Sequence, residues 1–263
     1  MSTLAYAARD SRTMLRRNLR RMQRYPSMTL MLVAIPAILL LLFVYVFGGT
    51  MGAGLGGISG GRADYANYVL PGILLLSLAS GATGTAVAIA MDMTEGIIAR
   101  FKTMAIFRPS VLTGHVLGSV IQMMLSLAVL IGVGLIVGFR PNATLLEWLA
   151  VAGLLLAISF AITWLSVALG LSAKTVEGAS NLPMPLILLP FLGSGFVPTE
   201  SMPTAVQWFA DYQPFTPMMD TLRGLLLGTA IGNDAWLACA WCVAITVAGF
   251  VWATRLYNRD PSR

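Results

Sequence analysis

Residues that could carry out chemistry are few in this sequence, and they stand apart from one another. Cys239 and Cys242 form a C-x-x-C pair, a spacing that places both thiols on one face of a helix. No other cysteine and no cluster of histidines completes the four-ligand set of a structural zinc ion. The single histidine, His115, has no carboxylate or cysteine beside it in the sequence. We interpret all three as packing residues rather than as metal ligands.

Two carboxylates, Asp92 and Glu95, lie three positions apart and could act as an acid–base pair. They stand, however, at the start of a short amphipathic run. Asp and Thr side chains accept hydrogen bonds from the first backbone amides of a helix, and the helix dipole favours a carboxylate there. We therefore expect Asp92 or Thr94 to cap a helix that begins here, with Glu95 favoured by its dipole.

A phosphate-binding loop is also missing. The glycine-rich stretch 48–61, GGTMGAGLGGISGG, lacks the Lys-Ser/Thr pair that follows the glycines of a P-loop. The two lysines, Lys102 and Lys174, lie elsewhere. The chain therefore has no Walker A motif with which to bind and hydrolyse ATP, and we interpret residues 48–61 as a flexible connector.

The composition of the chain indicates that its elements are transmembrane helices. Of the 263 residues, 57% are hydrophobic and 11% are charged, whereas soluble domains carry about 25% charged residues. Six stretches without Asp, Glu, Lys or Arg can each hold the roughly 20 apolar residues that cross a bilayer as a helix. Because lipid tolerates no unpaired backbone, we predict an all-α integral membrane protein. Its six transmembrane helices are expected near residues 27–47, 67–91, 116–139, 148–171, 181–197 and 235–254.

The basic residues set the predicted orientation. With both termini in the cytoplasm, 14 of the 17 Lys and Arg residues face inward, and the outer loops hold Arg62, Arg140 and Arg223. Such an excess is typical of cytoplasmic loops. We therefore interpret the net charge of +6 as the topology signal of a multi-pass protein in the cell membrane, and we expect no nucleic-acid binding.

Residues 1–26 form the predicted N-terminal interfacial helix, which lies on the inner membrane surface. Its apolar positions recur at helical spacing and its arginines occupy other faces: Leu4, Ala8, Leu15, Leu19 and Met22, against Arg9, Arg12, Arg16, Arg20 and Arg24. The apolar run that follows exceeds the 7–15 residues of a signal-peptide core, so we interpret it as an uncleaved first span. A basic tail that only sets the orientation is the alternative.

Residues 92–115 separate two very apolar stretches, and they predict a short cytoplasmic helix. Its apolar stripe has i, i+3 and i+4 spacings and consists of Ile97, Ile98, Phe101, Met104 and Ala105. Pro109 is expected to stop this helix. A helix of this kind either lies on lipid or fits a groove on a cytoplasmic partner.

Residues 197–228, between the fifth and sixth predicted spans, are too polar at their centre to cross a membrane and too apolar for a solvated loop. Their aromatic side chains fit the belt at the membrane interface: Trp208, Phe209, Tyr212 and Phe215. We predict two short re-entrant helices that dip into the outer leaflet and are separated by Pro214 and Pro217.

Small residues and prolines shape the predicted bundle. Pairs of small residues four positions apart predict close helix contacts, within the chain or with a second copy: Ser77/Gly81, Ser80/Gly84, Gly114/Gly118 and Gly134/Gly138. Prolines are expected to bend the first and fifth spans, because each removes a backbone donor: Pro36, Pro183, Pro185 and Pro190.

Two of these segments carry a family resemblance that covers nearly the whole chain. Glu95-Gly96, the amphipathic run and Arg108-Pro109 are similar to an E-G…T-P segment, with Arg108 where the family commonly has Thr. The second segment is more specific, and its matching residues are Phe196, Pro198, Met202, Pro203, Trp208, Pro214, Thr216, Pro217, Asp220, Arg223 and Gly228. The sequence thereby resembles the permease subunits of type-2 ABC exporters, especially the daunorubicin/doxorubicin-resistance-like branch.

The resemblance implies the ABC type-2 exporter fold in one transmembrane domain, 1–263. Its parts are an interfacial helix (1–26), spans one and two (27–91), a cytoplasmic coupling segment (92–115), spans three to five (116–197), an outer re-entrant segment (198–234), span six (235–254) and a cytoplasmic tail (255–263). Residues 92–108 would be the coupling helix that sits in a cleft of the ATPase, through Glu95, Gly96, Ile97, Arg100, Phe101, Met104, Arg108 and Pro109.

The same resemblance implies the partners and the function. Two cytoplasmic P-loop ATPase chains would bind ATP and Mg, and a second permease copy or a paralogue would complete the complex in membrane lipid. This chain itself would bind no cofactor. The predicted function is ATP-driven efflux of a hydrophobic or amphipathic compound that is drug-like, antibiotic-like or lipid-linked. Asp220 and Arg223 are interpreted as structural ion-pair partners.

Two other classes compete with this interpretation. A secondary carrier or channel without an ATPase is the main alternative. No acid or base lies near the centre of any predicted span, however, and ion-driven carriers usually place charged groups there. An intramembrane enzyme is disfavoured because the sequence contains no convergent catalytic set.

Overall fold

The computed structural model describes residues 12–18, 20, 24, 26–50, 61–97 and 109–258, and these residues are mostly helical. The elements in chain order are α2 (Pro26–Leu42), the π-helical η1 (Phe43–Phe47), α4 (Arg62–Thr94), α6 (Pro109–Val137), α7 (Leu145–Ser172), α8 (Val176–Asn181), α9 (Met184–Leu188), the 3-10 helices η2 (Leu189–Leu192) and η3 (Thr199–Ser201), α10 (Thr204–Tyr212), α11 (Phe215–Leu227) and α12 (Asp234–Asn258). Residues 12–18 are also helical and are called the N-terminal segment below.

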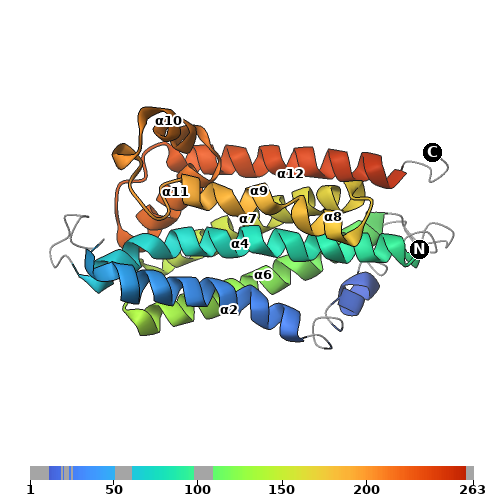
Figure 1. Cartoon of the computed structure of the whole chain (residues 1–263), viewed down its shortest axis with the longest axis horizontal. Coiled ribbons are helices and arrows are strands. Elements are labelled where there is room, and N and C mark those ends of the chain that lie inside the picture. The colour runs from blue at the N-terminus through green and yellow to red at the C-terminus, as the bar shows by residue number, and fades with distance from the viewer. Residues whose placement is uncertain are drawn as a thin grey trace.

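The long helices lie side by side in a bundle, with α4 and α7 at its centre (Figure 1). Most residues in the apolar parts of α4 and α7 are buried, whereas only a minority of those in α2, α6 and α12 are buried. One end of the bundle holds the end of α4, the start of α6 and the end of α12, and we call it the α4–α6 end. Helices α10 and α11 lie at the opposite end.

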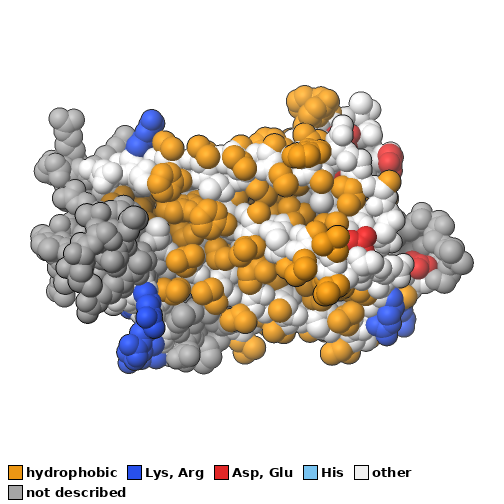
Figure 2. Space-filling view, turned by 180° about the vertical axis from the view of Figure 1, so that it is seen from behind, with side chains coloured by type: hydrophobic (Ala, Val, Ile, Leu, Met, Phe, Trp, Pro, Cys, Tyr) orange, Lys and Arg blue, Asp and Glu red, His pale blue; other side chains and the backbone are white. Residues whose placement is uncertain are grey.

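The surface has the charge distribution of a membrane protein. On the face drawn in Figure 2, hydrophobic side chains cover the middle of the bundle, while Lys, Arg, Asp and Glu side chains lie near its two ends. Within the described residues, five helices are long and apolar enough to cross a membrane: Leu30–Thr50, Arg62–Thr94, Leu112–Val137, Leu145–Ser172 and Asp234–Asn258. They coincide with the first, second, third, fourth and sixth predicted spans.

The predicted fifth span, 181–197, is not a single long helix. The apolar stretch Val176–Leu192 is divided into α8, α9 and η2. Pro183 precedes α9, Pro185 lies within its first turn, and Pro190 lies in η2. Each proline lacks the N–H that would continue the helical ladder, so the segment is divided into short helices where the sequence predicted only a bend. The segment packs along α4 within the bundle.

Local sequence explains where several elements begin and end. Thr144 and Glu147 form a capping box at the start of α7, in which the Thr144 side chain accepts from the Glu147 backbone and the Glu147 side chain accepts from the Thr144 backbone. At the start of α8, the Thr175 side chain accepts a hydrogen bond from the backbone N–H of Gly178. Gly228 ends α11 in the left-handed conformation, φ 75°, which a glycine adopts without strain.

The central helices approach one another through glycines. A Cβ added at Gly170 of α7 would lie 2.6 Å from the carbonyl oxygen of Ala86 in α4. One added at Gly249 of α12 would lie 2.7 Å from the backbone nitrogen of Leu165 in α7. These distances are too short for any side chain, so the backbones themselves are in contact, as small residues permit in membrane helices.

The predicted small-residue pairs have different partners. Gly114 and Gly118 of α6 face Met14 and Asn18 of the N-terminal segment, so this contact is within the chain. Gly81 faces Met123 of α6, and Gly134 faces Leu70 of α4. Gly84 and Gly138, in contrast, have no such neighbour within 4 Å among the described residues.

Replacing Gly249 tests the backbone contact between α12 and α7. Because the added methyl group has no space, Gly249→Ala should lower the thermal midpoint of the detergent-solubilised protein, with an overpacking cost of about 1–3 kcal/mol. Midpoints are measured by size-exclusion chromatography after heating. Gly153→Ala in α7 is the matched control, since its Cβ meets nothing within 4 Å. Equal midpoints for the two variants would contradict the contact.

Candidate functional site

The connection between α4 and α6 is the first candidate site. Glu95 is the C-cap of α4, and Gly96 follows with a positive φ of 70°, a left-handed conformation that turns the chain away from the helix. Glu95 is exposed. Residues 98–108 lie outside the described residues, so the predicted coupling contacts of Arg100, Phe101, Met104 and Arg108 stay predictions.

The predicted helix cap at Asp92 and Thr94 is wrong. Both residues lie in the last turn of α4, so they end a helix rather than begin one. Thr94 Oγ1 donates to the carbonyl oxygen of Met91, 3.1 Å away, and the Glu95 backbone N–H donates to the same oxygen. Helix α4 continues to Thr94, three residues past the predicted end of the second span at residue 91. Asp92 is buried and has partners from elsewhere in the chain.

Those partners are Arg17 of the N-terminal segment and His115 of α6. Asp92 Oδ2 lies 2.6 Å from Arg17 Nη2 and 2.9 Å from His115 Nε2, and these two nitrogens lie 3.2 Å apart. Asp92 and His115 are each 3% exposed. Sequence reasoning treated His115 as a packing residue without a carboxylate neighbour. The missed signal was the carboxylate itself, because an acid at the end of a long apolar helix needs a partner.

Pro109 is the first residue of α6, so α6 begins seven residues before the predicted third span. The predicted helix that Pro109 would stop falls on residues 98–108, which lie outside the described residues, so that prediction stays a prediction. Proline is well suited to the first turn, where its missing N–H breaks no helical hydrogen bond. The connection between the two helices is therefore 95–108, shorter than the 92–115 expected.

The second candidate site lies at the opposite end of the bundle. The two short helices predicted for 197–228 are present as α10 and α11. Pro198, Pro203 and Pro214 each stand directly before a helix, at η3, α10 and α11 respectively. Pro217 is not part of the separator that we expected, because it lies inside α11. Pro198, Pro203 and Pro214 thus determine where the helices of residues 197–228 start.

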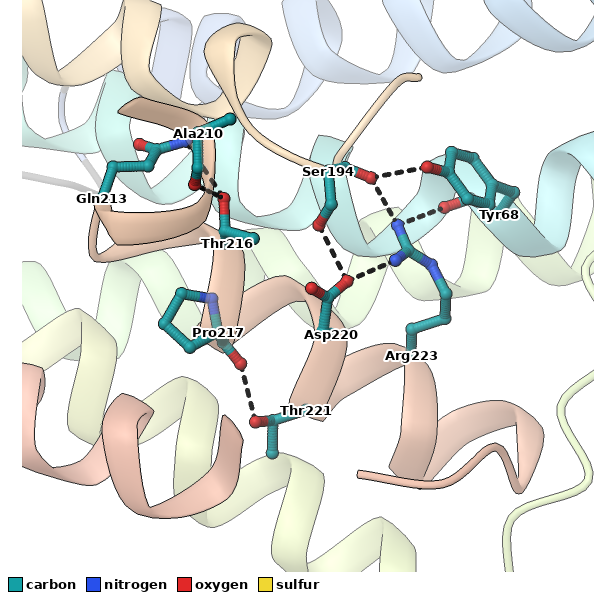
Figure 3. Close-up of polar contacts among 9 residues, drawn as sticks. All are labelled: Tyr68, Ser194, Ala210, Gln213, Thr216, Pro217, Asp220, Thr221 and Arg223. Carbon is teal, nitrogen blue, oxygen red and sulfur yellow. Dashed lines mark hydrogen bonds and ion pairs between the residues drawn. The ribbon is translucent and has the colours of Figure 1, made fainter. Parts of the chain in front are cut away.

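Arg223 of α11 is the centre of a polar network at this end (Figure 3). Its Nη1 donates to Asp220 Oδ1 at 2.5 Å and its Nη2 donates to the carbonyl oxygen of Ser194 at 2.7 Å. Its guanidinium lies over the ring of Tyr68 in α4, 4.1 Å from the centroid. The predicted ion pair of Asp220 and Arg223 is confirmed, and it is mostly shielded from solvent.

Ser194 and Tyr68 complete the network. Ser194 Oγ donates to Asp220 Oδ1 at 2.8 Å, and the Tyr68 hydroxyl donates to the carbonyl oxygen of Ser194 at 2.9 Å. Close beside it, a Cβ added at Gly72 of α4 would lie 2.7 Å from the carbonyl oxygen of Gly195. Three separate parts of the chain, namely α4, the turn after η2, and α11, are therefore joined through one guanidinium.

A second set of hydrogen bonds fixes the corner between α10 and α11 (Figure 3). Thr216 Oγ1 donates to the carbonyl oxygen of Ala210 at 2.6 Å. Gln213 Nε2 donates to the carbonyl oxygen of Leu189 at 3.0 Å, which links the corner to η2. Both side chains are buried, so the corner is part of the packed protein and not a solvated loop.

The aromatic residues at this end of the bundle have two different environments. Phe196 is buried, stacks on Phe191 with ring centroids 4.6 Å apart, and contacts Phe43 of η1. Trp208 and Tyr212 pair with each other on the surface of α10 and are 66% and 68% exposed. The buried set holds the turn after η2 in place, whereas the exposed set is available to the surroundings.

In the part of the chain that the structure describes, neither site has the residues of a metal centre. Among the described residues, no group of three or more His, Cys, Asp or Glu is placed to hold a metal ion. Cys242 is buried in α12 and Cys239 is exposed, and both are free thiols. The apolar bundle and its two polar ends define a class, that of multi-pass membrane proteins.

The comparisons with known proteins specify this class further. The family model for ABC-2 type transporters matches residues 9–227. The daunorubicin resistance ABC transporter permease protein DrrB1 of Streptomyces coeruleorubidus is 29% identical over 238 residues, which cover 90% of this chain and 81% of the relative. A probable doxorubicin resistance ABC transporter permease protein, DrrC of Mycobacterium tuberculosis, is 27% identical over 192 residues, or 69% and 68% of the two chains.

The chain belongs to the ABC-2 type transporter family. This confirms the resemblance and the prediction of a permease subunit, whose nucleotide hydrolysis is performed by a separate ATPase chain.

Arg223 offers a test of the outer polar network. Arg223→Gln should lower the thermal midpoint, because it leaves Asp220 and the Ser194 carbonyl without their charged donor, a loss of roughly 1–3 kcal/mol. Arg223→Lys should recover only part of the loss, since an ammonium lacks the planar fork that contacts both acceptors. Melting curves of the purified variants measure both effects.

Lys174→Gln provides the control for Arg223, because Lys174 is exposed and the substitution removes the same charge. It should leave the midpoint unchanged. An Arg223→Lys variant as stable as the original protein would show that the bidentate geometry is unimportant.

Proposed function

We propose that this chain is the membrane half of an ATP-driven exporter of a hydrophobic or amphipathic compound, drug-like, antibiotic-like or lipid-linked. The observation that carries the proposal is the similarity over most of the chain to permeases named for resistance to daunorubicin and doxorubicin. The exporter contains two permease chains, either two copies of this one or this one with a paralogue, and two P-loop ATPases that bind ATP and Mg.

The proposed topology has six spans and both termini in the cytoplasm. The broken segment Val176–Leu192 and the residues up to 197 form the fifth span. Basic residues at the α4–α6 end support this orientation, because cytoplasmic ends are enriched in them: Arg12, Arg16, Arg20, Arg24, Lys174 and Arg255. Helices α10 and α11 would then lie at the outer face and dip into the outer leaflet. The exposed side chains of Trp208, Tyr212 and Trp236 support this placement, because Trp and Tyr are enriched at the membrane interface.

Residues 95–108 are the proposed contact with the ATPase. Glu95 and Gly96 form the exit of α4, and the carboxylate of Glu95 is exposed and therefore available to a partner. A carboxylate at a helix C-terminus gains nothing from the helix dipole, which suggests that its role lies outside this chain. Movement of the ATPase would be passed from this contact into α4 and α6, the helices that the segment connects.

A reconstitution experiment tests the function. The chain is purified with its ATPase, incorporated into proteoliposomes and supplied with doxorubicin, whose fluorescence reports its transport. ATP-dependent movement that requires both proteins is expected. Accumulation against a gradient by this chain alone, in vesicles without an ATPase, would overturn the proposal in favour of a secondary carrier.

The coupling contact is tested by Glu95→Ala and Phe101→Ala. Both variants should assemble in the membrane but lose most ATP-dependent efflux, because the segment no longer fits the ATPase. Co-purification of the ATPase and the rate of doxorubicin efflux are measured together. Glu200→Ala is the control, since Glu200 is an exposed glutamate at the opposite end of the bundle. Unchanged efflux in both coupling variants would argue against this contact.

A further inference from the structure

Arg17, Asp92 and His115 form a polar cluster around a buried carboxylate, and the proposed contact with the ATPase does not use it. They come from three elements: the N-terminal segment, the end of α4 and the start of α6. We call these three residues the ionic tie. Asp92 is separated from Arg17 by 75 positions and from His115 by 23, so the tie is purely tertiary.

The geometry of the ionic tie centres on one oxygen atom. Asp92 Oδ2 is within hydrogen-bonding distance of both nitrogens, 2.6 Å from Arg17 Nη2 and 2.9 Å from His115 Nε2. An ionised carboxylate only accepts hydrogen bonds, so this oxygen can serve both donors. The exposed fraction of the Arg17 side chain is 34%, against 4% for that of Asp92. Arg17 therefore lies between the buried Asp92–His115 pair and the surface of the protein.

Packing around the tie brings the N-terminal segment against α6. Met14 is buried against Gly114, where an added Cβ would overlap the Cβ of Met14. Asn18 Nδ2 donates to the carbonyl oxygen of Gly114 at 2.8 Å. Met14, Arg17 and Asn18 are spaced i, i+3 and i+4, so one face of the segment makes all of these contacts. The segment is thus docked on the bundle through this face.

The position of the tie relates it to the 95–108 connection. Asp92 stands three residues before that connection and His115 seven residues after it, so the tie joins the two helices at the points where the connection enters and leaves. A force applied to residues 95–108 must act on α4 and α6 through this place. Without a cross-link there, the two helix ends could move separately.

We propose that Arg17, Asp92 and His115 hold the N-terminal segment and the inner ends of α4 and α6 together as one body, so that movement of the ATPase reaches both helices at once. This inference rests on the proposed function, because it names the residues that transmit the motion. They are positioning residues and contact neither substrate nor nucleotide. The charged cluster gives this junction a specific register, which apolar packing of the same helices would not define.

The test measures doxorubicin transported per ATP hydrolysed by the reconstituted complex of full-length chain and ATPase. Arg17→Gln should leave assembly and ATP hydrolysis in place but lower this ratio about fivefold or more, within the usual range of coupling between sites. Arg17→Lys should retain more of the ratio, because its ammonium can still donate to Asp92. Arg16→Gln is the matched control: the neighbouring arginine is exposed, and its loss removes the same charge without changing the ratio.

A second arm separates positioning from stability. Asn18→Cys and Gly118→Cys are introduced together with Arg17→Gln, in a chain whose own Cys239 and Cys242 are replaced by Ser and Ala. A Cβ at position 118 lies 2.9 Å from that of Asn18, close enough for a disulfide after a small shift. Oxidation should restore the transport-to-ATP ratio, because it fixes the segment on α6 again.

The outcomes separate this inference from the function on which it rests. Doxorubicin transport by the unaltered complex with an unchanged ratio in Arg17→Gln would overturn the ionic tie alone. If the ratio falls in Arg17→Gln and the disulfide does not raise it, the loss is not caused by release of the N-terminal segment. That result would overturn the proposal that the three residues hold the elements together as one body. If the unaltered complex transports no substrate with ATP, the proposed function fails and the inference fails with it.

Discussion

Everything in this structure depends on keeping α4 in direct contact with its neighbours. Lipid offers no hydrophobic force that would drive apolar helices together, so association must come from close packing and from polar interactions. The backbone of α4 meets that of α7 at Gly170 and the turn after η2 at Gly72 and Gly195. Side chains at these positions would separate the elements, and the bundle would lose its centre.

The two ends of α4 are fixed by charges rather than by packing alone. At one end, Tyr68 takes part in the network of Arg223, and at the other, Asp92 accepts from Arg17 and His115. In each case an arginine from a distant part of the chain joins α4 to two other elements. A buried charge is costly unless it is paired, so these networks tolerate few alternative arrangements. The central helix is thereby held as a rod with a defined position at both ends.

The bundle combines continuous central helices with a segment that is divided into short helices. In the proposed function, motion of the ATPase enters at one end of the bundle and passes into α4 and α6. The proline-divided α8 and α9 and the short helices α10 and α11 are bordered by prolines, which lack the backbone donor that would extend a helix. Rigid central helices beside a divided segment provide a structure in which one part can move relative to another.

Sequence alone determined the elements whose cause is local. Charge-free apolar stretches predicted the five long helices, Pro214 was predicted to separate two short helices, and Asp220 and Arg223 were predicted to pair. Tertiary structure decided the rest. Asp92 looked like a helix cap because its partners, Arg17 and His115, are far away in sequence, and only folding places them around one oxygen atom. The same holds for Gly72 and Gly195, since a glycine has no side chain whose pattern could reveal which backbone will lie against it.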